Sequence, residues 1–208
     1  METITRLFGL HLTVRESTPE IDTALNWLLG KINIQNEAVR VDKISTTDTE
    51  FKGLPFIPSR PSMLITAGTL FLSTIFDRCY DTKVLDLYHL LDKMGQKGKG
   101  RWFGKASSHN IFRAMVVHPE FSRGYATALA VDYLSNNQTN VTDWGPSLPF
   151  YQTLNALAHL DLPSANVQLD KAFSNLAETQ NEDGTWGRSE NEWNTFLTIH
   201  AMRNKGLL

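Results

Sequence analysis

Three tryptophans recur at a fixed interval of 42 residues, and each follows a glutamine by six positions. The three pairs are Gln96 and Trp102, Gln138 and Trp144, and Gln180 and Trp186. A fixed interval of this length is typical of stacked supersecondary units, each of which buries its apolar face against its neighbours. The sequence therefore predicts an array of similar units.

Each tryptophan lies in a turn between two segments with apolar residues at helical spacing, so each unit is expected to be a helical hairpin. The predicted first helices are 19–34, 82–97, 121–136 and 164–179, and the predicted second helices are 62–77, 107–117, 147–159 and 190–204. Strand signals are few, and only 39–41 and 56–57 are candidates for extended structure. The expected fold is all-α, with about four α/α hairpins in a single domain over residues 1–208.

The first unit is degenerate. Residues 21–28 resemble 169–176, and each run soon reaches a Gln-Asn-Glu triplet, at 35–37 and at 180–182. Val41 occupies the place of the tryptophan, and an insertion at about 42–60 precedes the next helix. The regular repeats then cover about 80–120, 121–162 and 163–208. Terminal repeats are commonly atypical because they cap the stack.

Composition narrows the class of protein. Hydrophobic residues make up 41% and charged residues 20% of the chain, and the net charge is -2 with acids and bases mixed. The absence of a basic stripe disfavours nucleic acid as a main partner. The single cysteine, Cys79, excludes an internal disulfide framework and fits a reducing compartment. With no apolar run of membrane-spanning length and no signal-peptide pattern, we expect a cytoplasmic protein without a transmembrane segment.

Each segment from the glutamine to the tryptophan is called a box here. The last box, Gln180-Asn-Glu-Asp183-Gly184-Thr-Trp186, resembles the Gln-x-x-Asp-Gly-Ser-Trp motif of squalene and terpene cyclases. The chain is similar to the prenyltransferase and squalene-oxidase repeat superfamily, well over 80–208 and weakly before it. The resemblance implies an α/α toroid whose second helices line an inner ring. Complete rings have six hairpins, so this chain implies a partial toroid that stays open or is closed by a second copy or another protein.

The boxes themselves suit a structural role. An Asp-Gly step favours a tight turn, and an indole can cover the end of a neighbouring helix. A glutamine amide can satisfy open backbone groups at a helix terminus. We therefore interpret the boxes as staples between hairpins; the alternative is that Gln180 and Trp186 bind ligand.

The resemblance also implies an isoprenoid-type ligand in an apolar cavity, without a cofactor. The Asp-x-Asp-Asp acid motif of class II cyclases and the carboxylate-rich metal box of class I enzymes are both missing. The nearest acid pair is Asp48 and Glu50, which we predict as catalytic acids if a cyclisation occurs. The alternative is a solvated loop that caps a helix. The adjoining segment 51–58 is similar to a Gly-Trp-Pro-Trp-x-Pro segment of small repeat proteins in this superfamily.

Asp77 and Cys79 have the spacing of the zinc-binding pair of protein prenyltransferases, with His109, His118, His159 or His200 as possible third ligands. A helix end followed by a half-buried cysteine explains the pair more simply, so no metal is predicted.

The second helices carry the candidate substrate-binding residues, which are His109, Arg113, Tyr151, Trp193 and His200. If these helices face a cavity, the set lines it with polar and aromatic groups, and Tyr151 and Trp193 would stabilise a cation. Otherwise they form hydrogen bonds at helix ends. Two rival functions stay open, namely a non-catalytic scaffold that binds a partner along its concave face, and a glycan-active toroid with two facing carboxylates.

Overall fold

The structure is a computed structural model that describes residues 1–14, 16–42, 53–138, 144 and 148–208. Within these ranges the chain is mostly helical, so the all-α class is confirmed. The elements in chain order are α1 (Glu2–His11), α2 (Pro19–Gly30), β1 (Ile32–Gln35), β2 (Ala38–Val41), α3 (Pro61–Ile75), α4 (Thr82–Lys97), α5 (Lys105–Val117), a 3-10 turn η2 (Phe121–Arg123), α6 (Tyr125–Asn137), α7 (Phe150–Leu157), α8 (Pro163–Glu178) and α9 (Asn191–Asn204).

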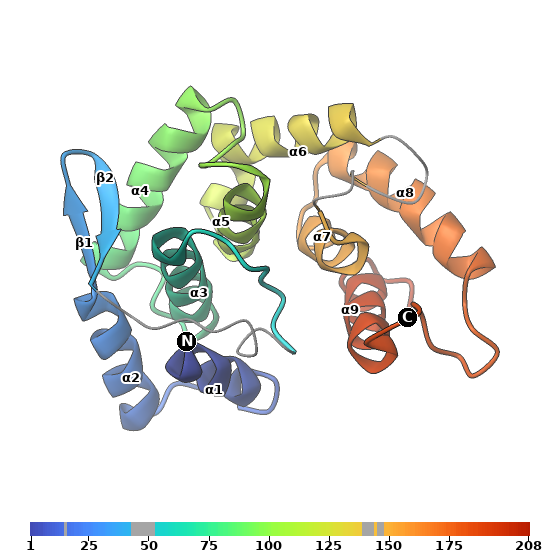
Figure 1. Ribbon diagram of the computed structural model, residues 1–208, viewed down its shortest axis with the longest axis horizontal. Helices are drawn as coiled ribbons and strands as arrows, with labels where there is room; N and C mark the ends of the chain where they lie inside the picture. Colours follow the sequence, from blue (N-terminus) through green and yellow to red (C-terminus); the bar gives the residue numbers. More distant parts are fainter. Residues whose placement is uncertain (15, 43–52, 139–143, 145–147) are drawn as a thin grey trace.

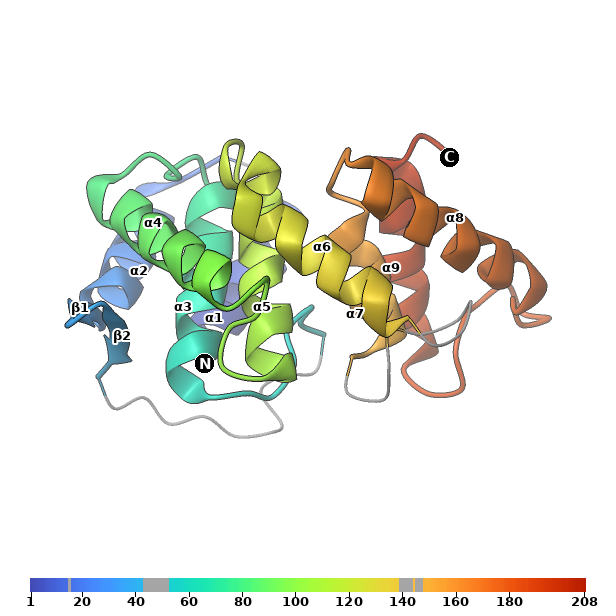
Figure 2. The same ribbon diagram turned by 90° about the horizontal axis from the view of Figure 1, so that it is seen from above.

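The helices of successive units lie in two rows. Helices α3, α5, α7 and α9 contact one another in that order and are called the inner row here, and α4, α6 and α8 form a second row, called the outer row. The second row arches over the first in Figure 1, and in Figure 2 α6 crosses the middle of the molecule between the α1–α5 and α7–α9 parts. Residues 63–74 of α3 and 107–116 of α5 are buried on every face, as expected of helices covered on several sides.

The three tryptophans mark equivalent steps along the outer row. The Trp102 indole Nε1 donates to the Leu91 carbonyl of α4 at 2.7 Å, and the Trp186 indole donates to the Leu176 carbonyl of α8 at 2.8 Å. The Trp144 indole donates to the Gln168 side chain at 2.8 Å, and the Gln168 amide donates to the Val131 carbonyl of α6 at 3.1 Å. Each ring is therefore tied to an outer helix by its nitrogen.

The glutamines and the Asp-Gly step of the boxes act locally. The Gln96 amide donates to the Asp92 side chain, and the Gln180 amide donates to the Gly184 carbonyl inside its own turn. The Gln138 side-chain nitrogen has no hydrogen-bond partner among the described residues. Gly184 has a φ of 81°, and the Asp183 carboxylate accepts the Thr185 backbone N–H at 3.0 Å, which is the turn chemistry expected from the sequence.

The first unit departs from the sequence prediction. The predicted helix 19–34 ends at Gly30, because β1 and β2 form an antiparallel hairpin over Ile32–Val41. Its two turn residues, Asn36 and Glu37, have positive φ angles of 50° and 56°. The Gln-Asn-Glu triplet therefore builds a hairpin turn here, in contrast to the loop at 180–182. Residues 56–57 are not a strand, and the predicted helix 121–136 is divided into η2 and α6.

Helix α1 was not predicted by the sequence analysis. Its buried residues are Ile4, Leu7 and Phe8, and it packs on α3 and α2. In Figure 1 it lies beneath α3, on the side of the inner row away from α4 and α6. Among the described residues, none of the helices has the length and apolar content needed to cross a bilayer.

Candidate functional site

One pocket lies where α1 meets the inner row. It has a volume of about 60 Å³ and receives side chains from α1, α3, α5, α7, α9 and the segment before α3. Its lining residues are Phe8, His11, Leu12, Pro55, Phe71, Ile75, Arg113, Asn155, His159, Phe196, Leu197 and His200. The chain thus brings residues from both of its ends to one place.

Arg113 is the most buried charged group in this pocket, with 1% of its surface exposed. Its Nη1 donates to the Asn155 side-chain oxygen at 2.9 Å, and its Nη2 donates to the Gln152 carbonyl at 2.6 Å. Both acceptors are neutral, and the buried Nε has no acceptor among the described residues. The guanidinium therefore links α5 to α7 while part of its hydrogen-bonding capacity stays unused.

No carboxylate in the described part of the chain forms an ion pair with Arg113. The described ion pairs lie elsewhere, at Arg6–Glu2, Arg78–Asp22, Arg78–Asp81 and Lys93–Glu37. Burial lowers the pKa of Arg113 to about 9, so the group stays charged at neutral pH. A buried charge without a counter-charge is costly, and an anion in the pocket would remove that cost.

Two histidines lie beside the guanidinium. The His159 and His200 rings are 5.6 Å apart, and the Asn155 amide nitrogen lies 3.1 Å from His200 Nδ1. Burial, together with the positive charges of Arg113, His200 and Lys205, lowers the pKa of His159. The polar end of the pocket is therefore rich in cationic and neutral donor groups, and its described lining contains no acid.

Aromatic rings form another part of the wall. Phe8 lies 6.1 Å from Phe71 and 6.1 Å from Trp193, measured between ring centroids. Trp193 stacks on Phe196 at 5.1 Å, and Phe196 lies 6.0 Å from His200. The Trp193 indole nitrogen is buried without a partner among the described residues. Aromatic faces of this kind pack against apolar groups and attract cations.

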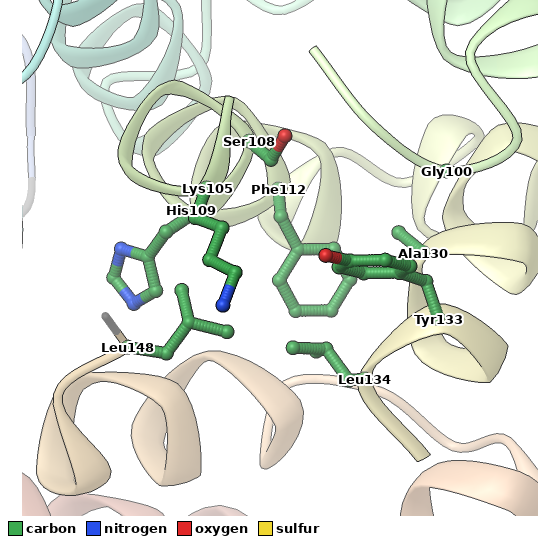
Figure 3. Close-up of a pocket in the computed structure, with 9 residues that line it drawn as sticks. All are labelled: Gly100, Lys105, Ser108, His109, Phe112, Ala130, Tyr133, Leu134 and Leu148. Atoms are coloured by element: carbon green, nitrogen blue, oxygen red, sulfur yellow. The ribbon is translucent and has the colours of Figure 1, made fainter. Parts of the chain in front are cut away.

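His109 lies one helical turn before Arg113 on the same side of α5, but it lines a different hollow. In Figure 3, His109, Lys105 and Phe112 extend from α5 toward Leu134 and Leu148 around a second hollow. That hollow is apolar and has a volume of about 20 Å³, enough for about one water molecule. His109 is therefore a packed core residue next to the pocket and does not line it.

The candidate residues from the sequence separate into three groups. Arg113 and His200 line the pocket, and Trp193 lies directly behind its aromatic wall. His109 and Tyr151 do not line it, and the Tyr151 ring packs against Phe150 at 5.1 Å.

Of the other lining residues, His159 was considered from the sequence only as a possible zinc ligand, and Phe8 and His11 were not predicted. Phe8 and His11 were missed because no helix was predicted over residues 2–11, although Ile4, Leu7 and Phe8 have the spacing of one helical face.

The remaining chemical candidates do not form a site in the described residues. Asp48 and Glu50 lie outside them. Cys79 is buried, and burial raises the pKa of its thiol, which keeps it protonated. Its carbonyl contacts His118 Nε2 at 3.3 Å through the backbone, not through sulfur. No group of three or more His, Cys, Asp or Glu side chains in the described ranges is close enough to hold a metal ion.

His109 gives a testable pH dependence. Burial, and then the charge of Arg113, lowers its pKa to about 3, below the value of about 6.5 expected in the unfolded chain. Between these values the unfolded state binds the proton more tightly, so the free energy of unfolding falls as the pH drops below about 6.5. We expect His109 to account for a loss of about 2 kcal/mol at pH 5.

The measurement is urea unfolding of the protein and of His109→Leu at pH 7.5 and pH 5. The variant should lose less stability on acidification by about that amount, because the buried histidine is gone. The exposed His89→Leu serves as the control and should behave like the parent. An equal acid loss in His109→Leu would contradict the prediction.

Comparison of the chain with protein-family models, curated proteins and solved structures gives no match.

Proposed function

We propose that this chain is an α/α-repeat protein of the prenyltransferase and terpene cyclase type, with its hairpins in a partial toroid. We further propose that its pocket binds an isoprenoid-type ligand by an anionic head group. The observation that carries the proposal is Arg113, a buried guanidinium that has neutral acceptors and no carboxylate among the described residues.

The arrangement of the pocket supports an amphiphile. Arg113, His159 and His200 surround the polar end, where a phosphate or diphosphate would find charge-assisted hydrogen bonds. Phe71 and Phe196 border the apolar side, as expected for a prenyl chain. Asp48 and Glu50 stay the candidate acids for a cyclisation, and the chemical step is left unassigned.

The two rival functions have less support. A protein partner along the inner row would contact α1, which packs on α3 there, and a scaffold role gives no reason for a buried Arg113 without a counter-charge among the described residues. A glycan-active site needs two carboxylates across a cavity, and none of the described residues around Arg113 is an acid.

The test is isothermal titration calorimetry with three probes: farnesyl diphosphate, inorganic diphosphate and farnesol. We expect farnesyl diphosphate to bind tightest, because it supplies both the anion and the apolar chain. Inorganic diphosphate should bind more weakly, and farnesol should bind weakest, since it leaves Arg113 unpaired. Equal affinities for farnesol and farnesyl diphosphate would contradict recognition of the head group, and no binding of either diphosphate would overturn the proposal.

A further inference from the structure

The pocket beside Arg113 is smaller than the proposed ligand. Ligand pockets commonly measure about 300–1,000 Å³, whereas this one measures about 60 Å³. A volume of that size holds a small anionic group but not a prenyl chain as well. The tail of the ligand therefore needs space that side chains fill in this structure.

Helix α1 supplies the side chains that fill it. Phe8, His11 and Leu12 form one wall of the pocket. The Phe8 ring lies 6.1 Å from both Phe71 on α3 and Trp193 on α9, so it fills the space between the two helices. Phe8 is thus an apolar group of the chain itself, held against the aromatic rings expected to contact a ligand.

The opposite side of α1 borders a wide groove. A groove of about 460 Å³ runs between α1 and α2, bordered by Leu7 and Leu10 on one side and by Ile21 and Ala24 on the other. Helix α1 is 10 residues long, and isolated helices of that length are marginal in water. An element with hollows on two sides is expected to open at a lower free-energy cost than the inner row.

We infer that α1 is a displaceable cover, and that the apolar tail of the bound ligand takes the position that Phe8 occupies between Phe71 and Trp193. This inference rests on the proposed function, because it concerns the tail of a ligand whose head group binds at Arg113. Outward movement of α1 joins the small pocket to the groove beside α2, which brings the free volume into the range of ligand sites.

Hydrogen exchange read by mass spectrometry tests the movement. With saturating farnesyl diphosphate, the amides of residues 2–11 should exchange at least tenfold faster than in the free protein, while those of α5 should be unchanged or slower. Inorganic diphosphate should leave the exchange of residues 2–11 unchanged, since it has no tail. Bound farnesyl diphosphate with unchanged or slower exchange in residues 2–11 would overturn the inference and leave the proposed function standing. Failure of farnesyl diphosphate to bind would overturn both.

Substitution of Phe8 provides an independent test. Phe8→Ala should bind farnesyl diphosphate about tenfold more tightly, because the ligand no longer has to displace a buried aromatic ring. The affinity for inorganic diphosphate should not change. Thr5→Ala is the control on the same helix, because Thr5 lines neither the Arg113 pocket nor the groove beside α2. Phe8→Leu, a milder change, should shift the affinity in the same direction and covers the case in which the alanine variant fails to fold. Unchanged affinity in a folded Phe8 variant would contradict the inference.

Discussion

Arg113→Met should reduce the affinity for farnesyl diphosphate about hundredfold while leaving the thermal unfolding midpoint equal to or above that of the parent. The loss of affinity follows because the guanidinium is the buried cation of the pocket and its Nε has no acceptor among the described residues. Truncating one partner of a desolvated, hydrogen-bonded charge pair commonly costs about 2–5 kcal/mol of binding free energy.

The expected stability separates a binding role from a structural one. If Arg113 were paired with a carboxylate of its own chain, its removal would leave a buried acid uncompensated and would cost about 3–5 kcal/mol. Without such a partner, methionine removes a charge that is costly to bury, but it also takes one donor from the Asn155 side-chain oxygen and one from the Gln152 carbonyl. These two effects oppose each other, so the net change in unfolding free energy should be small.

The measurement combines calorimetric titration with thermal unfolding of the free protein. Arg123→Met is the matched control, because Arg123 is exposed and lies in η2, outside the pocket. It should change neither quantity. Arg113→Lys should recover part of the affinity, because it keeps the charge but loses the planar donor arrangement. A strong loss of stability in Arg113→Met would indicate an internal counter-charge and would contradict the proposed anion site.

The sequence was most informative where one helix pattern repeats. The interval between Trp102, Trp144 and Trp186 predicted the helices from α4 to α9, because each unit buries the same face against similar neighbours. The prediction was wrong over residues 31–34, where the predicted helix continued into what is the β1–β2 hairpin, whereas residues 39–41, a candidate for extended structure, lie in β2. Asn36 and Glu37 adopt left-handed backbone angles in the hairpin turn, which their residue types permit but do not predict.

The site was harder to predict than the fold. Arg113 and His200 could be placed on inner helices by their spacing, but the lack of a described carboxylate beside Arg113 depends on which segments meet around it. Helix α1 lies outside the 42-residue repeat, so the repeat did not predict it. Its apolar face packs on α3, where the Ile4 side chain lies against Gly68. A Cβ at Gly68 would come within 3.2 Å of Ile4.

Trp102→Ala should lower the free energy of unfolding by about 3–5 kcal/mol, a large part of the stability of an ordinary domain. The Trp102 ring is 1% exposed, and a Cβ on Gly95 of α4 would come within 2.2 Å of it. The same Cβ would lie 2.9 Å from Ala126 of α6. The ring therefore packs where two outer helices approach each other. Its loss leaves a cavity, and Gly95 has no side chain that could move into it.

The position of each tryptophan in the array ranks the expected losses. Trp144, also 1% exposed, is linked through Gln168 to both α8 and α6, so Trp144→Ala should cost about as much as Trp102→Ala. Trp186 is 7% exposed and is bonded to α8, the last helix of the outer row, so Trp186→Ala should cost less.

Urea unfolding of the three alanine variants measures this order, with Trp27→Ala as the control. Trp27 is 49% exposed, and its loss should cost less than about 1 kcal/mol. Trp102→Phe keeps most of the apolar volume but removes the donor to the Leu91 carbonyl, and it should cost about 1–2 kcal/mol beyond the small loss of volume. Equal losses for Trp186→Ala and Trp102→Ala would contradict the ranking. Equal losses would mean that the rings stabilise their own turns and not the contacts between successive outer helices. The turn is the feature that the last unit shares with the earlier ones, whereas among the described residues no outer helix follows the last unit.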